Sequence, residues 1–126
     1  MKLRLGILAV VCTLSLVAWL GAPAPVRATA DCNIGNTTSP SGCDNGCLDF
    51  GFGPVTSQFP CGTFAVTLES RPPGGTWSFT GQSSNQHSGT IHYCPSAGTF
   101  EYRFKLTCKN CGPTIEYYAL GTFTCP

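Results

Sequence analysis

Residues 98–108, Gly98-Thr99-Phe100-Glu101-Tyr102-Arg103-Phe104-Lys105-Leu106-Thr107-Cys108, have the most regular pattern in the chain. Apolar side chains occupy every second position from Phe100 to Cys108, and polar or charged side chains stand between them. This alternation is typical of a β-strand with one face in the core and the other in water. We therefore predict that this strand is the central strand of a small antiparallel sheet.

Shorter patterns of the same kind surround this strand. Further strands are predicted at 63–69, 76–80, 90–94 and 114–125, the last with a bulge at Gly121. Proline and glycine mark turns at 71–75 and 95–98, and residues 81–89 have the composition of a polar surface loop. Short strands separated by regular turns predict an all-β fold, a small antiparallel immunoglobulin-like β-sandwich stabilised by disulfides.

The first 30 residues resemble a targeting segment. Lys2 and Arg4 precede an apolar stretch at 5–20, and Ala28-Thr29-Ala30 fits the small-residue rule for signal peptidase. A retained membrane anchor is the alternative, but the apolar stretch is shorter than the roughly 20 residues of a spanning helix. We expect cleavage after Ala30, no membrane span afterwards, and a secreted, extracellular or cell-surface protein.

Charge after residue 30 argues against one class of partner. Residues 31–126 carry four basic and six acidic residues, a formal net charge of −2, whereas the full chain has +1. A surface that binds the phosphates of nucleic acid is normally rich in lysine and arginine. We therefore expect no nucleic acid partner.

Eight cysteines follow the leader, and an even number in a short exported chain indicates a disulfide framework. They are Cys32, Cys43, Cys47, Cys61, Cys94, Cys108, Cys111 and Cys125. A chain of this length buries a modest core, and each bridge adds about 2–4 kcal/mol of stability. Four thiolates from the Cys43/Cys47 and Cys108/Cys111 pairs could form a zinc site, but an oxidising compartment favours bridges.

Residues 31–62 carry four of these cysteines and little periodic pattern. We predict a cysteine-rich, loop-rich cap with at most one short strand, packed on the strands of 63–126 within a single domain 31–126. Asn36-Thr37-Thr38 matches the glycosylation sequon, a triplet that is also common by chance.

The last two predicted strands are expected to form a hairpin, and the matching of their side chains predicts its register. Pairing Leu106 with Ile115 and Lys105 with Glu116 sets apolar side chains against each other and opposite charges together. This register places Cys125 near Cys94 and predicts a bridge between them. It also places Tyr118, Arg103 and Glu116 on the outer face, where we predict a binding surface for a protein or carbohydrate ligand.

Part of this pattern resembles a known family. Trp77-Ser78-Phe79-Thr80-Gly81, His92-Tyr93 and Pro95 to Phe100 resemble PKD-type and related bacterial immunoglobulin-like domains over roughly residues 63–108. The chain departs from the family at Thr80, where glycine is common, and in its cysteine-rich first third. The resemblance implies an extracellular, non-catalytic β-sandwich that serves as a spacer, adhesive or ligand-binding module.

No catalytic constellation, cofactor motif or metal motif is recognisable. His87 and His92 are the only histidines, both expected to be exposed, and no Gly-x-Ser-x-Gly motif is present. We predict a non-enzymatic binding, adhesion or assembly module, which could assemble with its own copies through an open β-edge. Two alternatives are a small disulfide-rich inhibitor or effector, and a thiol-redox protein that uses Cys108 and Cys111.

Overall fold

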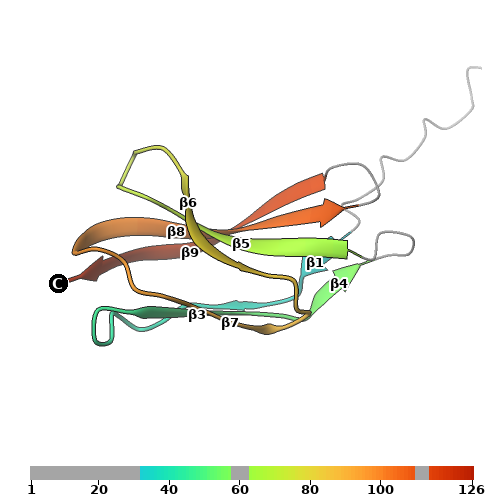
Figure 1. Cartoon of the computed structure of the whole chain (residues 1–126), viewed down its shortest axis with the longest axis horizontal. Helices are drawn as coiled ribbons and strands as arrows, with labels where there is room; N and C mark the ends of the chain where they lie inside the picture. Colours follow the sequence, from blue (N-terminus) through green and yellow to red (C-terminus); the bar gives the residue numbers. More distant parts are fainter. Residues whose placement is uncertain (1–31, 58–62, 110–113) are drawn as a thin grey trace, which may run out of the picture.

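The computed structural model describes residues 32–57, 63–109 and 114–126, which form nine antiparallel strands and no helix (Figure 1). The predicted leader and its cleavage site lie outside the described residues. None of the described residues belongs to a helix that could span a membrane. The strands are β1 (Cys32–Ile34), β2 (Thr37–Thr38), β3 (Leu48–Phe52), β4 (Val55–Ser57), β5 (Thr63–Arg71), β6 (Ser78–Ser84), β7 (Gly89–Tyr93), β8 (Gly98–Lys109) and β9 (Thr114–Cys125).

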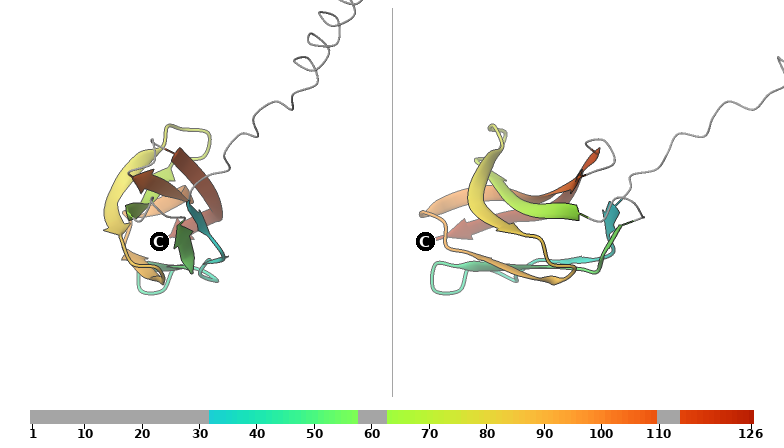
Figure 2. Two further views of the ribbon diagram at one scale, coloured as in Figure 1. Left: turned by 90° about the vertical axis from the view of Figure 1, so that its right-hand side faces the viewer. Right: turned by 45° about the vertical axis from the view of Figure 1, so that its right-hand side comes forward.

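Two sheets face each other as the layers of a sandwich (Figures 1 and 2). One sheet has three strands in the order β2-β3-β7, and the other has four in the order β6-β5-β8-β9. Strands β1 and β4 form a separate two-stranded ribbon at one end. The predicted all-β sandwich is therefore confirmed, and β8 is an inner strand of the larger sheet, as its alternating pattern predicted.

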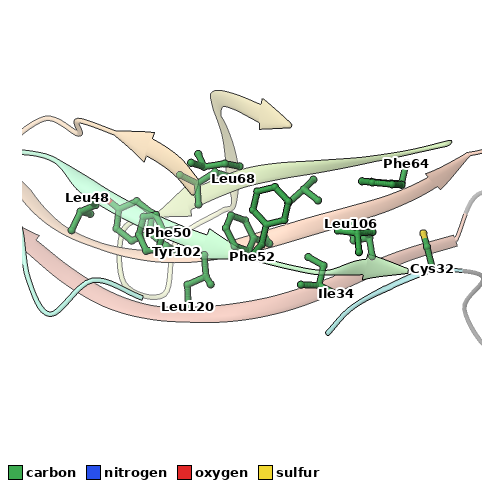
Figure 3. Packing of buried hydrophobic residues seen from close by; sticks show 14 of the residues in the cluster. Cys32, Ile34, Leu48, Phe50, Phe52, Phe64, Leu68, Tyr102, Leu106 and Leu120 are labelled. Carbon is green, nitrogen blue, oxygen red and sulfur yellow. The ribbon is translucent and has the colours of Figure 1, made fainter. Parts of the chain in front are cut away.

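The core lies between the sheets and combines aliphatic side chains with a cluster of aromatic rings (Figure 3). Phe50 of β3 is fully buried, and its ring centroid lies 5.1 Å from Tyr102, 6.4 Å from Phe104 and 5.7 Å from Phe123. Tilted and edge-on ring pairs of this kind are worth about 0.5–1.5 kcal/mol beyond the burial of their surface. The side chains of β3 therefore pack directly on those of β8 and β9.

The prediction of a loop-rich cap at 31–62 is wrong. Four short strands come from the described part of this segment, and β3 is the middle strand of the three-stranded sheet. Gly51 and Gly53 obscured the alternation of Leu48, Phe50 and Phe52, all three of which are buried. Glycine suits position 51 because a Cβ atom there would lie 2.1 Å from the hydroxyl oxygen of Thr38, whose side chain would have to rotate.

The polar stretch at 81–89 is shorter as a loop than its composition predicted. Strand β6 continues to Ser84 after a bulge opposite Leu68, where Thr67 pairs with Ser83 and Glu69 pairs with Phe79. The Thr80 hydroxyl donates a hydrogen bond of 2.8 Å to the Leu68 carbonyl within this bulge. Bulges of this kind bend a strand without ending it, so polar residues here extend the sheet.

The predicted register of the β8–β9 hairpin is also wrong by one residue. Leu106 pairs with Glu116, Lys105 with Tyr117 and Phe104 with Tyr118. A shift of one residue turns every side chain of β9 to the opposite face. The bulge predicted near Gly121 is confirmed, because the register shifts between the pairs of Arg103 with Ala119 and Tyr102 with Gly121, and Gly121 has φ of 115°.

Three disulfides join the described parts of the chain, namely Cys32–Cys108, Cys43–Cys125 and Cys47–Cys94. The predicted Cys94–Cys125 bridge is wrong, because Cys94 bonds to Cys47 and Cys125 bonds to Cys43. Cys61 and Cys111 lie outside the described residues. Several disulfides in a small chain are typical of an oxidising environment outside the cytoplasm.

Candidate binding face on the four-stranded sheet

The outer face of the four-stranded sheet carries a network of arginine and aromatic side chains. Arg103 of β8 lies beside Trp77 and Tyr117, with its guanidinium carbon 4.3 Å and 3.8 Å from the two ring centroids. Its Nε donates a hydrogen bond of 2.6 Å to Glu69 Oε2 on β5. Cation–π contacts of this type add about 0.5–2 kcal/mol according to how far they are desolvated.

A second arginine repeats the arrangement at the same aromatic ring. The guanidinium carbon of Arg71 lies 4.4 Å from the Trp77 centroid, and Arg71 forms an ion pair with Glu101. Both pairs link β5 to β8, where Glu69 is opposite Arg103 and Arg71 is opposite Glu101. These two arginines are therefore already engaged with partners of the sheet itself.

The three residues predicted to form a binding surface do not share a face. Arg103 lies on the outer face, but the corrected register turns Tyr118 and Glu116 toward the inside of the sandwich. The Tyr118 hydroxyl accepts a hydrogen bond of 3.0 Å from the Ile34 amide and lies 2.8 Å from both Asn33 Oδ1 and Glu116 Oε2. Burial is the main cause that raises the pKa of Tyr118 above its ordinary value.

Glu116 tolerates its inner position because it is only half-buried on the edge strand β9 and its carboxylate has a hydrogen-bond donor. The ribbon strand β1, rather than an apolar sheet, covers Tyr118 there, and the Glu116 carboxylate is hydrogen-bonded by the Tyr118 hydroxyl. The register that was predicted by matching side chains between β8 and β9 is wrong for this reason. The hydrogen-bond partner of Glu116 is Tyr118 on the same strand, and not a residue of β8.

Tyr117 takes the exposed position that was predicted for Tyr118. Its side chain is 52 % exposed on β9, and Phe79 on the opposite edge strand β6 is 60 % exposed. Two large aromatic side chains thus stand at the two sides of the ion-pair network. Aromatic residues with arginine are over-represented among residues that dominate protein interfaces.

Positive charge gathers on this face although residues 31–126 together carry a net negative charge. All four basic residues after residue 30 lie on β5 and β8, at outward positions, and they are Arg71, Arg103, Lys105 and Lys109. In the part of the chain that the structure describes, the acidic side chains on this face are those of Glu69 and Glu101. Among the described residues, neither Lys105 nor Lys109 forms an ion pair. Composition gave no sign of this segregation.

One cluster of potential metal ligands occurs on the opposite sheet. The ligand atoms of Cys47, His92 and Cys94 lie within 4.8 Å of one another. Cys47 and Cys94 are bonded to each other, so neither sulfur is a thiolate that could hold an ion. The zinc pairs considered from the sequence are also separated, because Cys43 bonds to Cys125 and Cys108 to Cys32.

Searches with this chain found no matching protein-family model, no matching curated protein and no matching solved structure.

Proposed function

We propose that this protein is a secreted, non-catalytic immunoglobulin-like domain that binds an acidic region of a partner protein on the outer face of its four-stranded sheet. The gathering of all four basic residues on that face carries the proposal. The exposed Tyr117 and Phe79 would supply apolar contact, and Lys105 and Lys109 would supply charge complementary to carboxylates.

Two features favour a protein ligand over a small molecule. A hollow of about 240 Å³ beside Gly121 is lined in part by Arg71 and Trp77, and a wider one of about 710 Å³ is lined by Lys109 and by neither Trp77 nor Tyr117. The smaller volume is below the roughly 300–1,000 Å³ of typical small-molecule sites, so the hollow beside the arginine and aromatic network suits a single side chain. The Trp77 ring, which could otherwise stack on a sugar, is already contacted by two guanidinium groups.

The resemblance to PKD-type domains and the order of the strands agree with a binding module. A three-stranded and a four-stranded sheet packed face to face are typical of immunoglobulin-like sandwiches. Assembly through an open edge has less support, because the long edge strands β6 and β9 each carry a bulge, and bulges discourage pairing with another chain.

The two alternatives from the sequence also have less support. An inhibitor would present a stapled loop from 31–62, but that segment contributes strands of the sandwich. A redox pair of Cys108 and Cys111 conflicts with the bond from Cys108 to Cys32, in which both cysteines are buried.

Binding to immobilised poly-L-glutamate, measured by biolayer interferometry at low and at physiological salt, tests the proposal. We expect Lys105→Gln to weaken binding about threefold, as the loss of one exposed charge pair would, and Tyr117→Ala to weaken it about tenfold. Thr90→Glu on the other sheet is the matched control, since it lowers the net charge by the same amount as Lys105→Gln.

Two results would contradict the proposal. One is an equal effect of Thr90→Glu and Lys105→Gln, because the charge of the whole molecule rather than this face would then govern binding. The other is binding to a sulfated polysaccharide without binding to poly-L-glutamate, because the ligand would then be a carbohydrate.

A further inference from the structure

A histidine contacts one of the disulfides on the sheet opposite the candidate binding face. His92 of β7 is directly opposite Asp49 of β3, and its Nδ1 lies 2.6 Å from Asp49 Oδ1. The other ring nitrogen, Nε2, lies 3.3 Å from Sγ of Cys94, two residues further along the chain. The imidazole therefore stands between a carboxylate and a disulfide sulfur.

The side chains of this group are accessible. The side chains of His92 and Asp49 are 63 % and 62 % exposed, and Cys94 is exposed. An ion pair this exposed contributes little to folding stability, so its main consequence is the orientation of the imidazole ring. Asp49 fixes Nδ1 as the nitrogen that faces the carboxylate, which directs Nε2 toward the sulfur.

Cys47, the other half of the bridge, ends a tight turn. Asp44 and Cys47 exchange two backbone hydrogen bonds of 2.9 Å, and Asn45 and Gly46 between them have φ of 50° and 79°. Two central residues with positive φ form the type of turn that suits a two-residue hairpin. Cys47 is thus partly exposed beside a surface turn, where an incoming group can approach.

The two other disulfides of the described chain lack these features. Both sulfurs of Cys32–Cys108 belong to buried residues, and Cys125 of Cys43–Cys125 is also buried. Within the described ranges, neither bridge has a histidine contact. The three bridges are therefore chemically unequal, although their spacing in the sequence gave no means to rank them.

We propose that Cys47–Cys94 is an exchangeable disulfide that reacts with an external dithiol, and that His92 assists by stabilising the departing Cys94 thiolate. This proposal does not depend on the binding function, because the bridge lies on the other sheet. The remaining described bridges serve as structural links that persist through the exchange.

The exchange proceeds in two balanced steps. A thiolate of the dithiol attacks Sγ of Cys47, the bond between Cys47 and Cys94 breaks, and its electron pair leaves on Sγ of Cys94. The imidazolium of His92 then donates its Nε2 proton toward this thiolate. The second thiol of the dithiol loses its proton to water and attacks the mixed disulfide, and the Cys47 thiolate that this step frees takes up a proton from water. The protein disulfide is thereby reduced to two thiols, and the dithiol is oxidised to its own disulfide.

The histidine matters because thiol–disulfide exchange is faster when the leaving thiolate is stabilised. Imidazolium groups beside cysteine are a recurrent means of stabilising the thiolate. The same ring also lies within 4.8 Å of the Cys47 sulfur, but its contact of 3.3 Å is with the Cys94 sulfur, whereas the Cys47 sulfur has a contact of 3.8 Å with the Asn45 carbonyl. The asymmetry makes Cys94 the leaving sulfur and Cys47 the site of attack.

Timed reduction with dithiothreitol, quenched by alkylation and read by peptide mass spectrometry, tests the proposal within one molecule. We expect Cys47–Cys94 to open about tenfold faster than Cys43–Cys125, and His92→Gln to remove most of this difference. Reduced glutathione, a monothiol, should leave its adduct on Cys47 and leave Cys94 free for alkylation. His87→Gln is the matched control, because His87 is exposed but bonds to the Val55 carbonyl and not to a sulfur.

The pH profile separates participation in the exchange from a structural role. The advantage of the wild type over His92→Gln, at constant thiolate concentration, should be largest at acidic pH and vanish at alkaline pH, where the imidazole is neutral. The titratable group that contacts this ring is Asp49 of β3, and the other contact is the bonded sulfur of Cys94, the residue after β7, which does not titrate while the bridge is intact.

The proposal is overturned if Cys47–Cys94 opens no faster than Cys43–Cys125. It is equally overturned if His92→Gln leaves the rate at Cys47–Cys94 unchanged at every pH. A glutathione adduct on Cys94 instead of Cys47 would refute the assigned direction of attack.

Discussion

Replacing Phe50 by alanine measures how much the segment with strands β1 to β4 contributes to the core. Phe50 is fully buried and packs on Tyr102, Phe104 and Phe123. Truncation of a buried phenylalanine costs about 3–5 kcal/mol, a large part of the roughly 5–15 kcal/mol that stabilises a small domain. We therefore expect Phe50→Ala to lower the free energy of unfolding by about 4 kcal/mol.

Guanidinium chloride titration with the disulfides intact provides the assay, followed by the fluorescence of Trp77, the one tryptophan after residue 30. Phe79→Ala is the matched control, because Phe79 is also on a strand but is 60 % exposed, and it should change stability by no more than about 0.5 kcal/mol. If Phe50→Ala prevents folding, Phe50→Leu should still cost about 1–1.5 kcal/mol. Equal effects at Phe50 and Phe79 would refute the placement of β3 in the core and would favour a peripheral cap.

The remaining predictions concern register, alkaline pH and pairing. Tyr118→Phe should cost about 1–2 kcal/mol of folding stability, because the hydroxyl bonds to Ile34 and Glu116, whereas Tyr117→Phe should be neutral in the same denaturation assay; the opposite order would support the rejected register. Burial raises the pKa of Tyr102 to about 12, so the folded state keeps this proton while the unfolded chain loses it above its ordinary value of about 10. Stability should accordingly be complete below pH 10 and fall by about 2–3 kcal/mol as pH rises to 12, and Tyr102→Phe should flatten this fall in a pH series of unfolding curves. Peptide mapping of the oxidised protein should recover Cys43 joined to Cys125 and Cys47 joined to Cys94, with no free thiol after residue 30; a Cys94–Cys125 peptide would contradict both of these pairings.

The errors made from the sequence share a physical origin. A strand was recognisable where apolar residues occupy every second position without interruption, as in β8. Glycine hid the same alternation in β3, because Gly51 is favoured by the close approach of Thr38 rather than by a turn. The bulge in β6 allowed polar residues to continue a strand that composition had ended at Thr80.

The candidate binding face was predicted only in part. Arg103 was correctly placed outside, but Tyr117 replaces Tyr118 beside it, since a one-residue shift reverses a strand. The sequence did not predict that Arg71 and Arg103 both contact the Trp77 ring, because only the tertiary structure brings these three residues together. The cluster of His92 with Asp49 and Cys94 joins two strands far apart in the sequence.

The sequence by itself determined the class of fold. Strict alternation at 98–108, frequent turns and an even number of cysteines lead to a disulfide-linked β-sandwich, because these signals depend on neighbours along the chain. Only the tertiary structure decided the register of β9, the pairing of the cysteines and the side on which Tyr117, Tyr118 and Glu116 lie. These properties depend on which distant strands meet, and one residue of shift in that meeting exchanges the inner and outer faces of a strand.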